Sequence, residues 1–235
     1  MVDETGSEVR LPRGVRVIDC SIRTILKHHE MHGPFCHVGS LINKPDVTED
    51  MVARTRKLFL DQDSTGFLGI DLCPGPNVDL VADLCDPDFL REHRGLVGNF
   101  GTVFCYALLE HVKNPFDAAR TIESLIAPGG HLYFGGPWAW GYHPYPRDYF
   151  RISFDGLEVL FPELQWRQRW YMSHKKNVGI ELDDRRGEKK IFRLHQVDGV
   201  SSLLSDIGMP YLNLGAVDQK PAVSVQDSTE DGRPA

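Results

Sequence analysis

Titratable side chains in two stretches are the residues of this chain best suited to chemistry. Glu110 and His111 follow an apolar run. His143, Asp148 and Arg151 lie in a stretch rich in proline and aromatic residues. An unperturbed imidazole, with a pKa of about 6.5, can take a proton from a hydroxyl or ammonium group near neutral pH. We therefore take His143 as the candidate general base and His111 as a second catalytic candidate, for a reaction whose acceptor must lose a proton.

The same residues have structural interpretations that the sequence leaves open. Asp148 could pair with Arg151 to hold its loop, with His143 hydrogen-bonded to the pair. Glu110 and His111 could cap the turn that follows the apolar run. Aromatic residues nearby could wall an acceptor pocket or fill the core beneath a long loop. The candidate acceptor-binding residues are Trp138, Trp140, Tyr142, Tyr145, Asp148 and Arg151.

A strand–helix–strand unit in residues 101–138 would position both stretches. Val103–Leu109 is an apolar run of strand length, and Asn114 followed by Pro115 is typical of a helix start. The elements that follow are a helical apolar stripe (Phe116, Ala119, Ile122, Leu125), a helix stop at Ala127–Gly130 and a strand at His131–Phe134. Such a unit implies parallel strands and a right-handed crossover. Ligands of parallel sheets lie beyond the carboxyl ends of the strands, here residues 106–111 and 135–138.

The remaining elements follow from apolar periodicity and turn residues. We expect strands at 34–40, 66–71, 78–84 and 165–172, and helices at 15–30, 47–61 and 154–164. The charged run 175–190 is typical of a surface loop. We predict a single domain over 11–216, with a helical segment at 11–33, a disordered N-terminus at 1–10 and a disordered tail at 217–235.

The composition restricts the partners of the chain. A formal net charge of −7 argues against general nucleic-acid binding and against a membrane surface, since both need a basic face. No apolar run approaches the roughly 20 residues of a membrane span, and the acidic start is unlike a signal peptide. The five cysteines lack C-x-x-C spacing and are expected to be reduced. We expect a cytoplasmic monomer or homodimer.

One group of metal-type side chains lies near the start of the chain. It contains His28, His29, His32, Cys36 and His37, and His28 and His32 have the i, i+4 spacing of helical ligands. No second pair of ligands at a fixed spacing accompanies the group. The sequence therefore predicts no metal site.

Three segments together resemble one group of class I S-adenosylmethionine-dependent methyltransferases, of the small-molecule, type 11-like kind. They are GIDLCPGPNVDLVADL, VFCYALLEHVKNPFDAARTIESLIAPGGHLYFGGPW and HPYPRDYFRIS. The resemblance covers roughly residues 34–165, and its most specific parts are the LEHV…NP…PGG order and the H-x-Y-P-x-D-Y-x-R run. It implies a Rossmann-like, doubly wound α/β fold with a mostly parallel, seven-stranded sheet and helices on both faces.

The resemblance also implies a site for S-adenosylmethionine at the strand ends. Asp71 would hold the ribose hydroxyls, as an acidic residue does at this place in nucleotide-binding sheets, although it could equally cap a turn. By the same resemblance, Asp83 and the backbone N–H group of Leu84 would contact the adenine, and Gly39 and Ser40 would approach the methionine portion. The implied cofactor-binding residues are Gly39, Ser40, Asp71, Leu72, Asp83, Leu84, Tyr106 and Ala107. The first loop departs from the family pattern, because it has one glycine and His37 takes the usual acidic position.

We therefore expect an enzyme that transfers a methyl group from S-adenosylmethionine to a small-molecule acceptor, by O- or N-methylation of, for example, a sugar or natural product. The glycine-poor first loop supports an alternative, a catalytically silent protein of the same fold that binds a partner or metabolite. A nicotinamide-dependent dehydrogenase is a third interpretation. Binding of S-adenosylmethionine or of NAD would separate the three.

Overall fold

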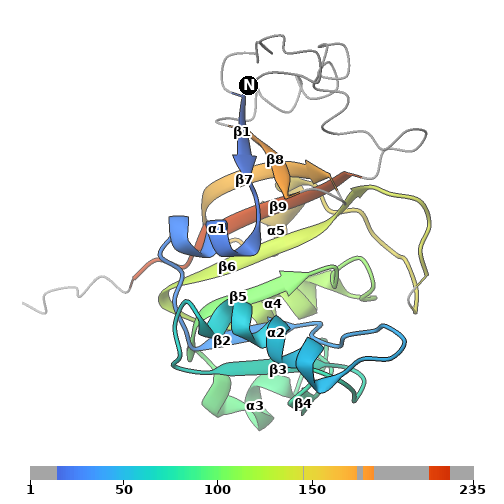
Figure 1. Cartoon of the computed structure of the whole chain (residues 1–235). Helices are drawn as coiled ribbons and strands as arrows, with labels where there is room; N and C mark the ends of the chain where they lie inside the picture. The colour runs from blue at the N-terminus through green and yellow to red at the C-terminus, as the bar shows by residue number, and fades with distance from the viewer. Residues whose placement is uncertain (1–14, 145, 174–176, 183–211, 223–235) are drawn as a thin grey trace, which may run out of the picture.

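One mixed sheet forms the centre of the molecule in the computed structural model, which describes residues 15–144, 146–173, 177–182 and 212–222 (Figure 1). Its nine strands have the order β1-β8-β7-β9-β6-β5-β2-β3-β4. The strands are β1 (Val15–Asp19), β2 (Phe35–Val38), β3 (Phe67–Asp71), β4 (Leu80–Val81), β5 (Phe100–Tyr106), β6 (Ile126–Ala139), β7 (Gln165–Ser173), β8 (Val178–Leu182) and β9 (Leu212–Gln219). The helices are α1 (Ile22–His28), α2 (Glu49–Leu60), α3 (Phe89–Glu92), α4 (Pro115–Leu125) and α5 (Phe154–Leu160), with a 3-10 turn η1 (Arg94–Leu96).

The sheet corrects the expectation of seven mostly parallel strands. β2, β3, β4, β5 and β6 form the four parallel pairings. β9 pairs antiparallel with both β6 and β7, and β8 pairs antiparallel with both β7 and β1. Parallel neighbours need long crossovers, whereas antiparallel strands can be added at an edge without them. The α/β class is confirmed, with a parallel half and an antiparallel extension.

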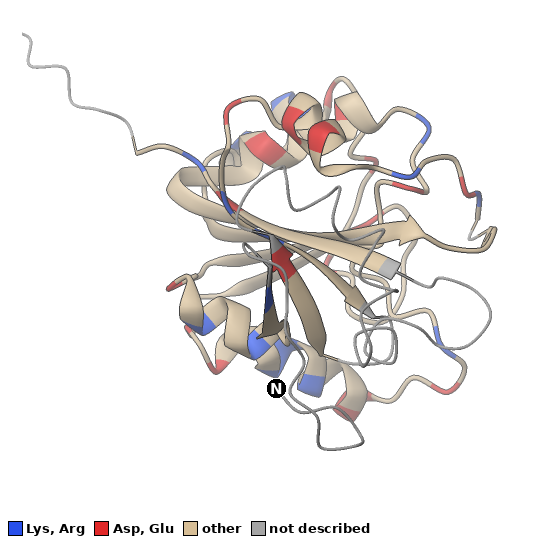
Figure 2. Cartoon of the chain, turned by 90° about the horizontal axis from the view of Figure 1, so that it is seen from above, with Lys and Arg blue, Asp and Glu red and all other residues tan. Residues whose placement is uncertain are grey.

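Helices cover both faces of the sheet, as the resemblance implies. α1 and α2 lie on one face, and α3, α4 and α5 lie on the other (Figures 1 and 2). Phe59 and Trp170 are buried in the first layer, and Ile122 and Phe154 in the second. Burying a side chain of this kind stabilises the fold by about 1.5–3 kcal/mol. Charged residues lie mainly on the helices and loops outside the sheet (Figure 2).

The central helix α4 forms where the sequence predicts it. Oδ1 of Asn114 accepts the N–H groups of Phe116 at 3.2 Å and Asp117 at 3.4 Å, and Pro115 is the first helical residue. Phe116 is 55% exposed, so it does not belong to the buried stripe as expected. The buried apolar stripe consists of Ala118, Ala119, Ile122 and Leu125.

Several predicted boundaries are wrong because strand pairing overrides local periodicity. The segment 11–33, expected to be helical, contains the strand β1, whose backbone pairs with β8. β8 itself lies within the run 175–190 that we expected to be a surface loop. β6 runs through Ala127–Gly130, the expected helix stop, and β4 keeps only two residues of the expected strand 78–84.

The predicted C-terminal end of the domain, at residue 216, is also wrong, because β9 extends to Gln219. Val217, where we expected a disordered tail to begin, is fully buried in β9 between β6 and β7. The predicted disordered segment 1–10 and the rest of the predicted tail from residue 223 lie outside the described residues. Within the part of the chain that the structure describes, no helix is long and apolar enough to cross a membrane.

β9 carries a buried carboxyl group at Asp218. This residue is 0% exposed. One carboxyl oxygen accepts the N–H group of Gln219 at 2.6 Å, and the other has no hydrogen-bond partner among the described residues. Burial raises the pKa of Asp218 to about 7, because surroundings of low polarity favour the neutral form.

Replacing Asp218 by asparagine should remove a pH-dependent loss of stability. The folded state raises the pKa of Asp218 from 3.8 to about 7. The contribution of this residue to the free energy of unfolding is therefore fully present below pH 3.8 and is lost as the pH rises through 7. Relative to Asp218→Asn, the wild type should lose about 3 kcal/mol of unfolding free energy between pH 4.5 and 8.5. Urea unfolding of both proteins measures this difference, and a difference independent of pH would contradict the raised pKa.

Candidate functional site

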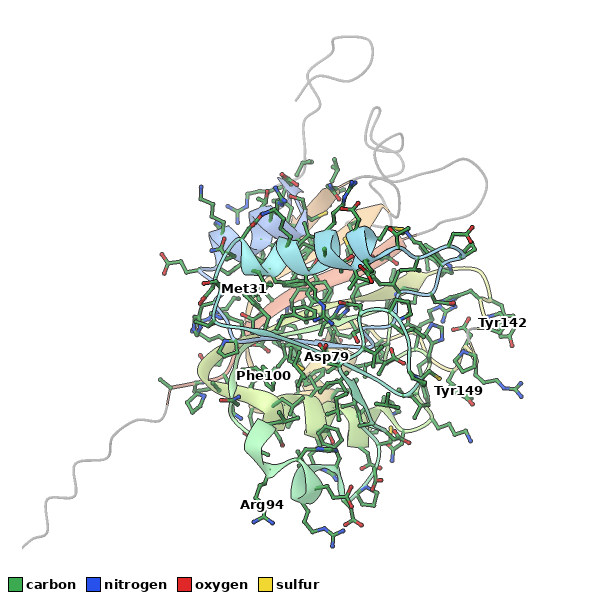
Figure 3. All side chains as sticks on the ribbon, turned by 60° about the horizontal axis from the view of Figure 1, so that its bottom comes forward. Met31, Asp79, Arg94, Phe100, Tyr142 and Tyr149 are labelled. Carbon is green, nitrogen blue, oxygen red and sulfur yellow. The ribbon has the colours of Figure 1, made fainter. Side chains whose placement is uncertain are left out.

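The carboxyl ends of the parallel strands meet at one side of the sheet, which we call the strand-end edge. β2, β3, β4, β5 and β6 end at Val38, Asp71, Val81, Tyr106 and Ala139. Parallel neighbours end on the same side, so the loops that follow them are brought together. Figure 3 shows Tyr142 and Tyr149 on this side of the molecule, and Met31 and Phe100, near the starts of β2 and β5, on the other.

The first loop turns sharply after β2 at a single glycine. Gly39 has a φ of +71°, a conformation that L side chains rarely adopt. A Cβ atom there would lie 3.2 Å from the side chain of Leu108, so the glycine also allows close approach to the loop after β5. The N–H groups of Gly39 and Ser40 donate to the carbonyl of Ile70 at 2.9 and 3.1 Å. These bonds tie the first loop to β3.

Ser40 points into the protein rather than out from the strand-end edge. Its side chain is buried, and its hydroxyl has no hydrogen-bond partner among the described residues. A Cβ atom on Gly69 would lie 2.7 Å from this hydroxyl, which places it against β3. The carbonyl of Ser40 accepts from Nδ2 of Asn77 at 2.9 Å. A contact between Ser40 and the methionine portion of a cofactor therefore stays a prediction.

Asp71 joins two loops at the end of β3. Its Oδ2 accepts the N–H group of Leu41 at 3.0 Å, and its Oδ1 accepts that of Cys73 at 3.1 Å. The turn-capping interpretation of Asp71 is therefore present in the structure. A carboxylate has about four acceptor sites, so these two bonds leave capacity for two hydroxyl donors. The ribose-binding interpretation of Asp71 stays a prediction.

Leu72 and the two residues predicted to contact the adenine, Asp83 and Leu84, lie near Asp71 along the strand-end edge. Leu72 is 62% exposed. Asp83 is exposed and accepts the N–H group of Cys85 at 2.8 Å. The side chain of Leu84 is buried in the core, so its predicted contact would have to come from its backbone N–H group.

β5 brings Tyr106 and Ala107 to the middle of the edge. The phenol oxygen of Tyr106 accepts from Nδ2 of Asn213 at 3.2 Å, and burial raises the pKa of this tyrosine. Its ring lies over Gly135, where a Cβ atom would come within 2.4 Å of it. Ala107 is exposed and has a φ of +51°, and its N–H group donates to the carbonyl of Gly135 at 2.8 Å. A non-glycine residue in this conformation stores about 1–3 kcal/mol of strain and is often part of a functional site.

Glu110 is a buried carboxyl group between the loops after β5 and β6. It is 3% exposed, and its Oε1 has no hydrogen-bond donor among the described residues. Burial raises the pKa of Glu110, an effect opposed by the nearby His111 and Arg151. Its backbone carbonyl accepts the N–H groups of Tyr149 at 2.8 Å and Phe150 at 3.3 Å. Glu110 therefore anchors the loop that follows β6.

His111 and His143, the two catalytic candidates, face each other across these loops. Their ring centroids are 5.1 Å apart with an interplanar angle of 74°. Nδ1 of His111 lies 2.6 Å from the carbonyl oxygen of Arg147. Nδ1 of His143 lies 3.3 Å from Oδ2 of Asp148 and 3.3 Å from the carbonyl oxygen of Gly141. One nitrogen of each ring and one oxygen of Glu110 all lie within 4.8 Å of one another.

An ion pair between Asp148 and Arg151 holds the loop after β6. Both carboxylate oxygens of Asp148 accept hydrogen bonds from Arg151, and Nη2 donates to Oδ2 at 2.7 Å. Oδ2 also accepts the backbone N–H group of His143 at 3.1 Å. Nη2 of Arg151 further donates to the carbonyls of Trp140 and Gly141, each at 3.4 Å. Hydrogen bonds from Arg151 hold the pKa of Asp148 well below its usual range. The structural interpretation of this pair is confirmed, and its contact with an acceptor stays a prediction.

The aromatic residues predicted to bind the acceptor fall into two groups. Trp138 is partly buried and packs against the core, with its ring centroid 5.9 Å from that of Tyr171. Trp140 lies 6.0 Å from the ring of His143, and Tyr142 is 73% exposed. Tyr145 lies outside the described residues. Trp140 and Tyr142 therefore remain the candidates for an acceptor wall.

The sequence did not reveal that Glu110 is buried, and it predicted no metal site at the histidine group near the start of the chain. The signal for Glu110 was its place beside His111 at a strand end, but its burial follows only from the fold. Within the histidine group, His29 and His32 line one surface pocket, whereas His37 lies among phenylalanine rings. The ring of His37 lies 5.0 Å from that of Phe104, and burial lowers its pKa to about 4. Nε2 of His29 is instead 2.7 Å from Oε1 of Gln168.

Solved structures identify the architecture. A SAM-dependent methyltransferase from Archaeoglobus fulgidus superimposes with a TM-score of 0.51, covering 85% of this chain and 93% of that chain at 11% identity. This chain has the fold of the S-adenosylmethionine-dependent methyltransferases. The [4+2]-cyclase SpnF matches with the same TM-score of 0.51, at 12% identity over 86% of this chain and 80% of that chain. Likeness at this identity shows the fold alone, and one fold can serve different reactions.

Sequence similarity to curated proteins is limited to a short stretch. Over 37 residues the chain is 43% identical to a ubiquinone biosynthesis O-methyltransferase of Ralstonia nicotianae, and over 37 residues it is 40% identical to that of Vibrio parahaemolyticus. The chain spans 16% of the length of these curated relatives. No family model matches the chain.

Loss of the Asp148 carboxylate should destabilise the protein. Asp148→Asn removes the paired hydrogen bonds and leaves Arg151 without its counter-charge, at a cost of about 2–3 kcal/mol. This corresponds to a Tm lowered by roughly 4–10 °C, measured by calorimetry. The matched control is Asp88→Asn, which breaks an ion pair of the same i, i+3 spacing with Arg91 at an exposed place. The control should shift the Tm by less than about 3 °C, and equal shifts would contradict a stabilising role of the buried pair.

Proposed function

We propose that this protein transfers a methyl group from S-adenosylmethionine to an oxygen or nitrogen atom of a small-molecule acceptor. The observation that carries the proposal is the arrangement at the strand-end edge. Asp71 retains open acceptor sites next to the exposed Leu72. His111 and His143 face each other beside the buried Glu110. The fold supports the proposal, and the stretch shared with two curated O-methyltransferases favours an oxygen acceptor.

The side chains at the edge fit this cofactor in chemical type. Asp71 would accept the two ribose hydroxyl groups at its open sites. Leu72 would cover the adenine with apolar surface, and Asp83 would accept from the adenine amino group. The close turns at Gly39 and Ala107 would let the backbone approach the methionine portion. When bound, S-adenosylmethionine supplies a methyl group on a sulfonium sulfur and leaves as S-adenosylhomocysteine.

The loop after β6 would form the acceptor side. Trp140 and Tyr142 would hold the acceptor, and the ion pair of Asp148 with Arg151 fixes the loop that carries them. Orientation of the two reactants is a large part of catalysis in such an in-line displacement. His143 would take the acceptor proton or orient the acceptor, with His111 as the second candidate. A general base of this kind contributes about 10²–10⁴-fold to the rate.

The first loop favours a second candidate function. It has one glycine, its serine hydroxyl is buried, and Asp71 is already engaged by two backbone N–H groups. A catalytically silent protein of this fold would bind a partner or metabolite without methyl transfer. Thermal stabilisation by S-adenosylmethionine or S-adenosylhomocysteine supports the enzyme, and stabilisation by neither supports the silent protein. Stabilisation by NAD would support a dehydrogenase. A cytoplasmic location and a monomeric or homodimeric state stay predictions.

Asp71→Ala should weaken binding of S-adenosylmethionine by about tenfold or more. The reason is the loss of hydrogen bonds from the ribose hydroxyls to a charged acceptor, worth about 1.5–3 kcal/mol. Isothermal titration calorimetry measures the effect. Asp63→Ala is a matched control, because Asp63 caps the N–H groups of Thr65 and Gly33 at the other end of β3, each at 3.0 Å. An equal loss of affinity in both variants would show that Asp71 acts through loop structure alone.

Trp140→Ala should raise the KM for the acceptor several-fold and leave the affinity for S-adenosylmethionine within about twofold. The substitution removes ring surface beside His143 and keeps the backbone carbonyl that accepts from Arg151. A panel of phenols, sugars and amines with methyl-labelled cofactor would first identify the acceptor. The opposite pattern, with weakened cofactor binding and unchanged KM for the acceptor, would show that the loop after β6 forms the cofactor side and not the acceptor side.

A further inference from the structure

Glu110, His111 and His143 form a compact group of metal-ligand atoms. One nitrogen of each ring and one carboxylate oxygen lie within 4.8 Å of one another, and Nε2 of His111 is 3.7 Å from Oε1 of Glu110. Metal–ligand bonds of about 2.1 Å separate neighbouring ligand atoms by roughly 3–3.5 Å, so small side-chain rotations would close the group around an ion. We propose that these three residues bind a divalent transition-metal ion.

Both histidines are oriented as metal ligands usually are. A ligating histidine commonly donates its second N–H group to a carboxylate or a backbone carbonyl, which fixes the ring. Nδ1 of His111 is 2.6 Å from the carbonyl oxygen of Arg147. Nδ1 of His143 is 3.3 Å from the carbonyl oxygen of Gly141. Each ring is therefore held through Nδ1, and Nε2 remains to bind an ion.

The carboxylate of Glu110 provides an independent observation. Its Oε1 is buried and lacks a hydrogen-bond donor in the described part of the chain. The side chains of Phe134, Pro137 and Ile152 surround it and donate no hydrogen bond, and the space between them is too small for a water molecule. Leaving a buried acceptor unsatisfied is unfavourable, and a bound cation would satisfy it.

The local charge also permits a cation. Arg151 lies close enough to influence Glu110, but its guanidinium group is neutralised by paired hydrogen bonds to Asp148. With Glu110 ionised, the carboxylates of Glu110 and Asp148 leave one net negative charge around the group. Asp148 would thus have two roles, as the counter-ion of Arg151 and as the acceptor of the backbone N–H group of His143.

The ligand types select the kind of ion. Two imidazole rings and one carboxylate suit Zn²⁺, Mn²⁺, Co²⁺ or Fe²⁺, whereas Mg²⁺ and Ca²⁺ prefer oxygen ligands alone. Three protein ligands leave further coordination positions open, as in catalytic rather than structural sites. This inference departs from the expectation of no metal, which rested on a different group of histidines.

The use of the ion rests on the proposed function. A hydroxyl oxygen of the acceptor bound at an open position would become more acidic, because the cation stabilises the alkoxide or phenolate. The O–H bond would break with release of the proton to water. The oxygen would then form its bond to the methyl carbon as the bond between that carbon and the sulfonium sulfur breaks, and S-adenosylhomocysteine would be the leaving group. His143 would orient the acceptor through the ion instead of taking the proton itself.

Metal titration of the full chain tests the binding site without any acceptor. After chelation and buffer exchange, calorimetry with ZnCl₂ and absorption spectra with CoCl₂ should show one site in the wild type. Glu110→Gln and His143→Ala should each weaken binding at this site at least tenfold, with circular dichroism and Tm confirming that the variants fold. The control His93→Ala removes a histidine near Phe89, outside the group, and should bind as the wild type does. Wild-type affinity in both site variants would overturn the proposal.

The proposed metal site and the proposed methyl transfer can each be disproved without the other. Metal binding that depends on Glu110 and His143 supports the site even if no methyl transfer is found, because the titration needs no cofactor. Unaltered Co²⁺ spectra in both variants, together with methyl transfer that persists after chelation, overturn the metal site and leave the proposed function standing with His143 as the base.

Discussion

Parallel pairing of β2 with β3 on one side and β5 on the other is the constraint on which the site depends. The two ladders place Val38 opposite both Ile70 and Cys105. The chain therefore leaves three neighbouring strands at nearly the same level, at Gly39, Asp71 and Tyr106. Because β2 is bonded along both edges and Val38 is fully buried, its end cannot shift without breaking both ladders. The loops after β2, β3 and β5 begin from this fixed line.

The antiparallel extension supports the other half of the edge. β9 lies between β6 and β7, so β6 is bonded on both sides and carries the loop after Ala139 as a continuation of a rigid strand. Asn213 of β9 also bonds to the phenol oxygen of Tyr106. The same strand buries Asp218, whose neutral form the interior favours near pH 7. Completion of the sheet thus places a titratable group where it opposes stability at high pH.

Three carboxylates lie at the strand-end edge, and they differ in whether the protein supplies them with hydrogen-bond donors. Asp71 and Asp148 are engaged by backbone N–H groups, and Asp148 also by an arginine. Glu110 is more deeply placed than Asp71, yet its Oε1 has no such partner within the described residues. Buried polar groups are ordinarily satisfied in folded proteins, so the unsatisfied one is where a ligand would gain most. Among these three carboxylates, Glu110, with His111 and His143 beside it, is therefore the best candidate to bind a cation.

The sequence by itself determined the local elements. The Asn114 cap, the Thr48 cap of α2 and the ends of β2 and β3 follow from hydrogen bonds and periodicity within a few residues. Only the tertiary structure decided that β1, β8 and β9 join the sheet, because strand pairing depends on partners far along the chain. It also placed His37 among phenylalanines and His111 beside His143. Long-range packing sets the surroundings of each histidine, and those surroundings determine its chemistry.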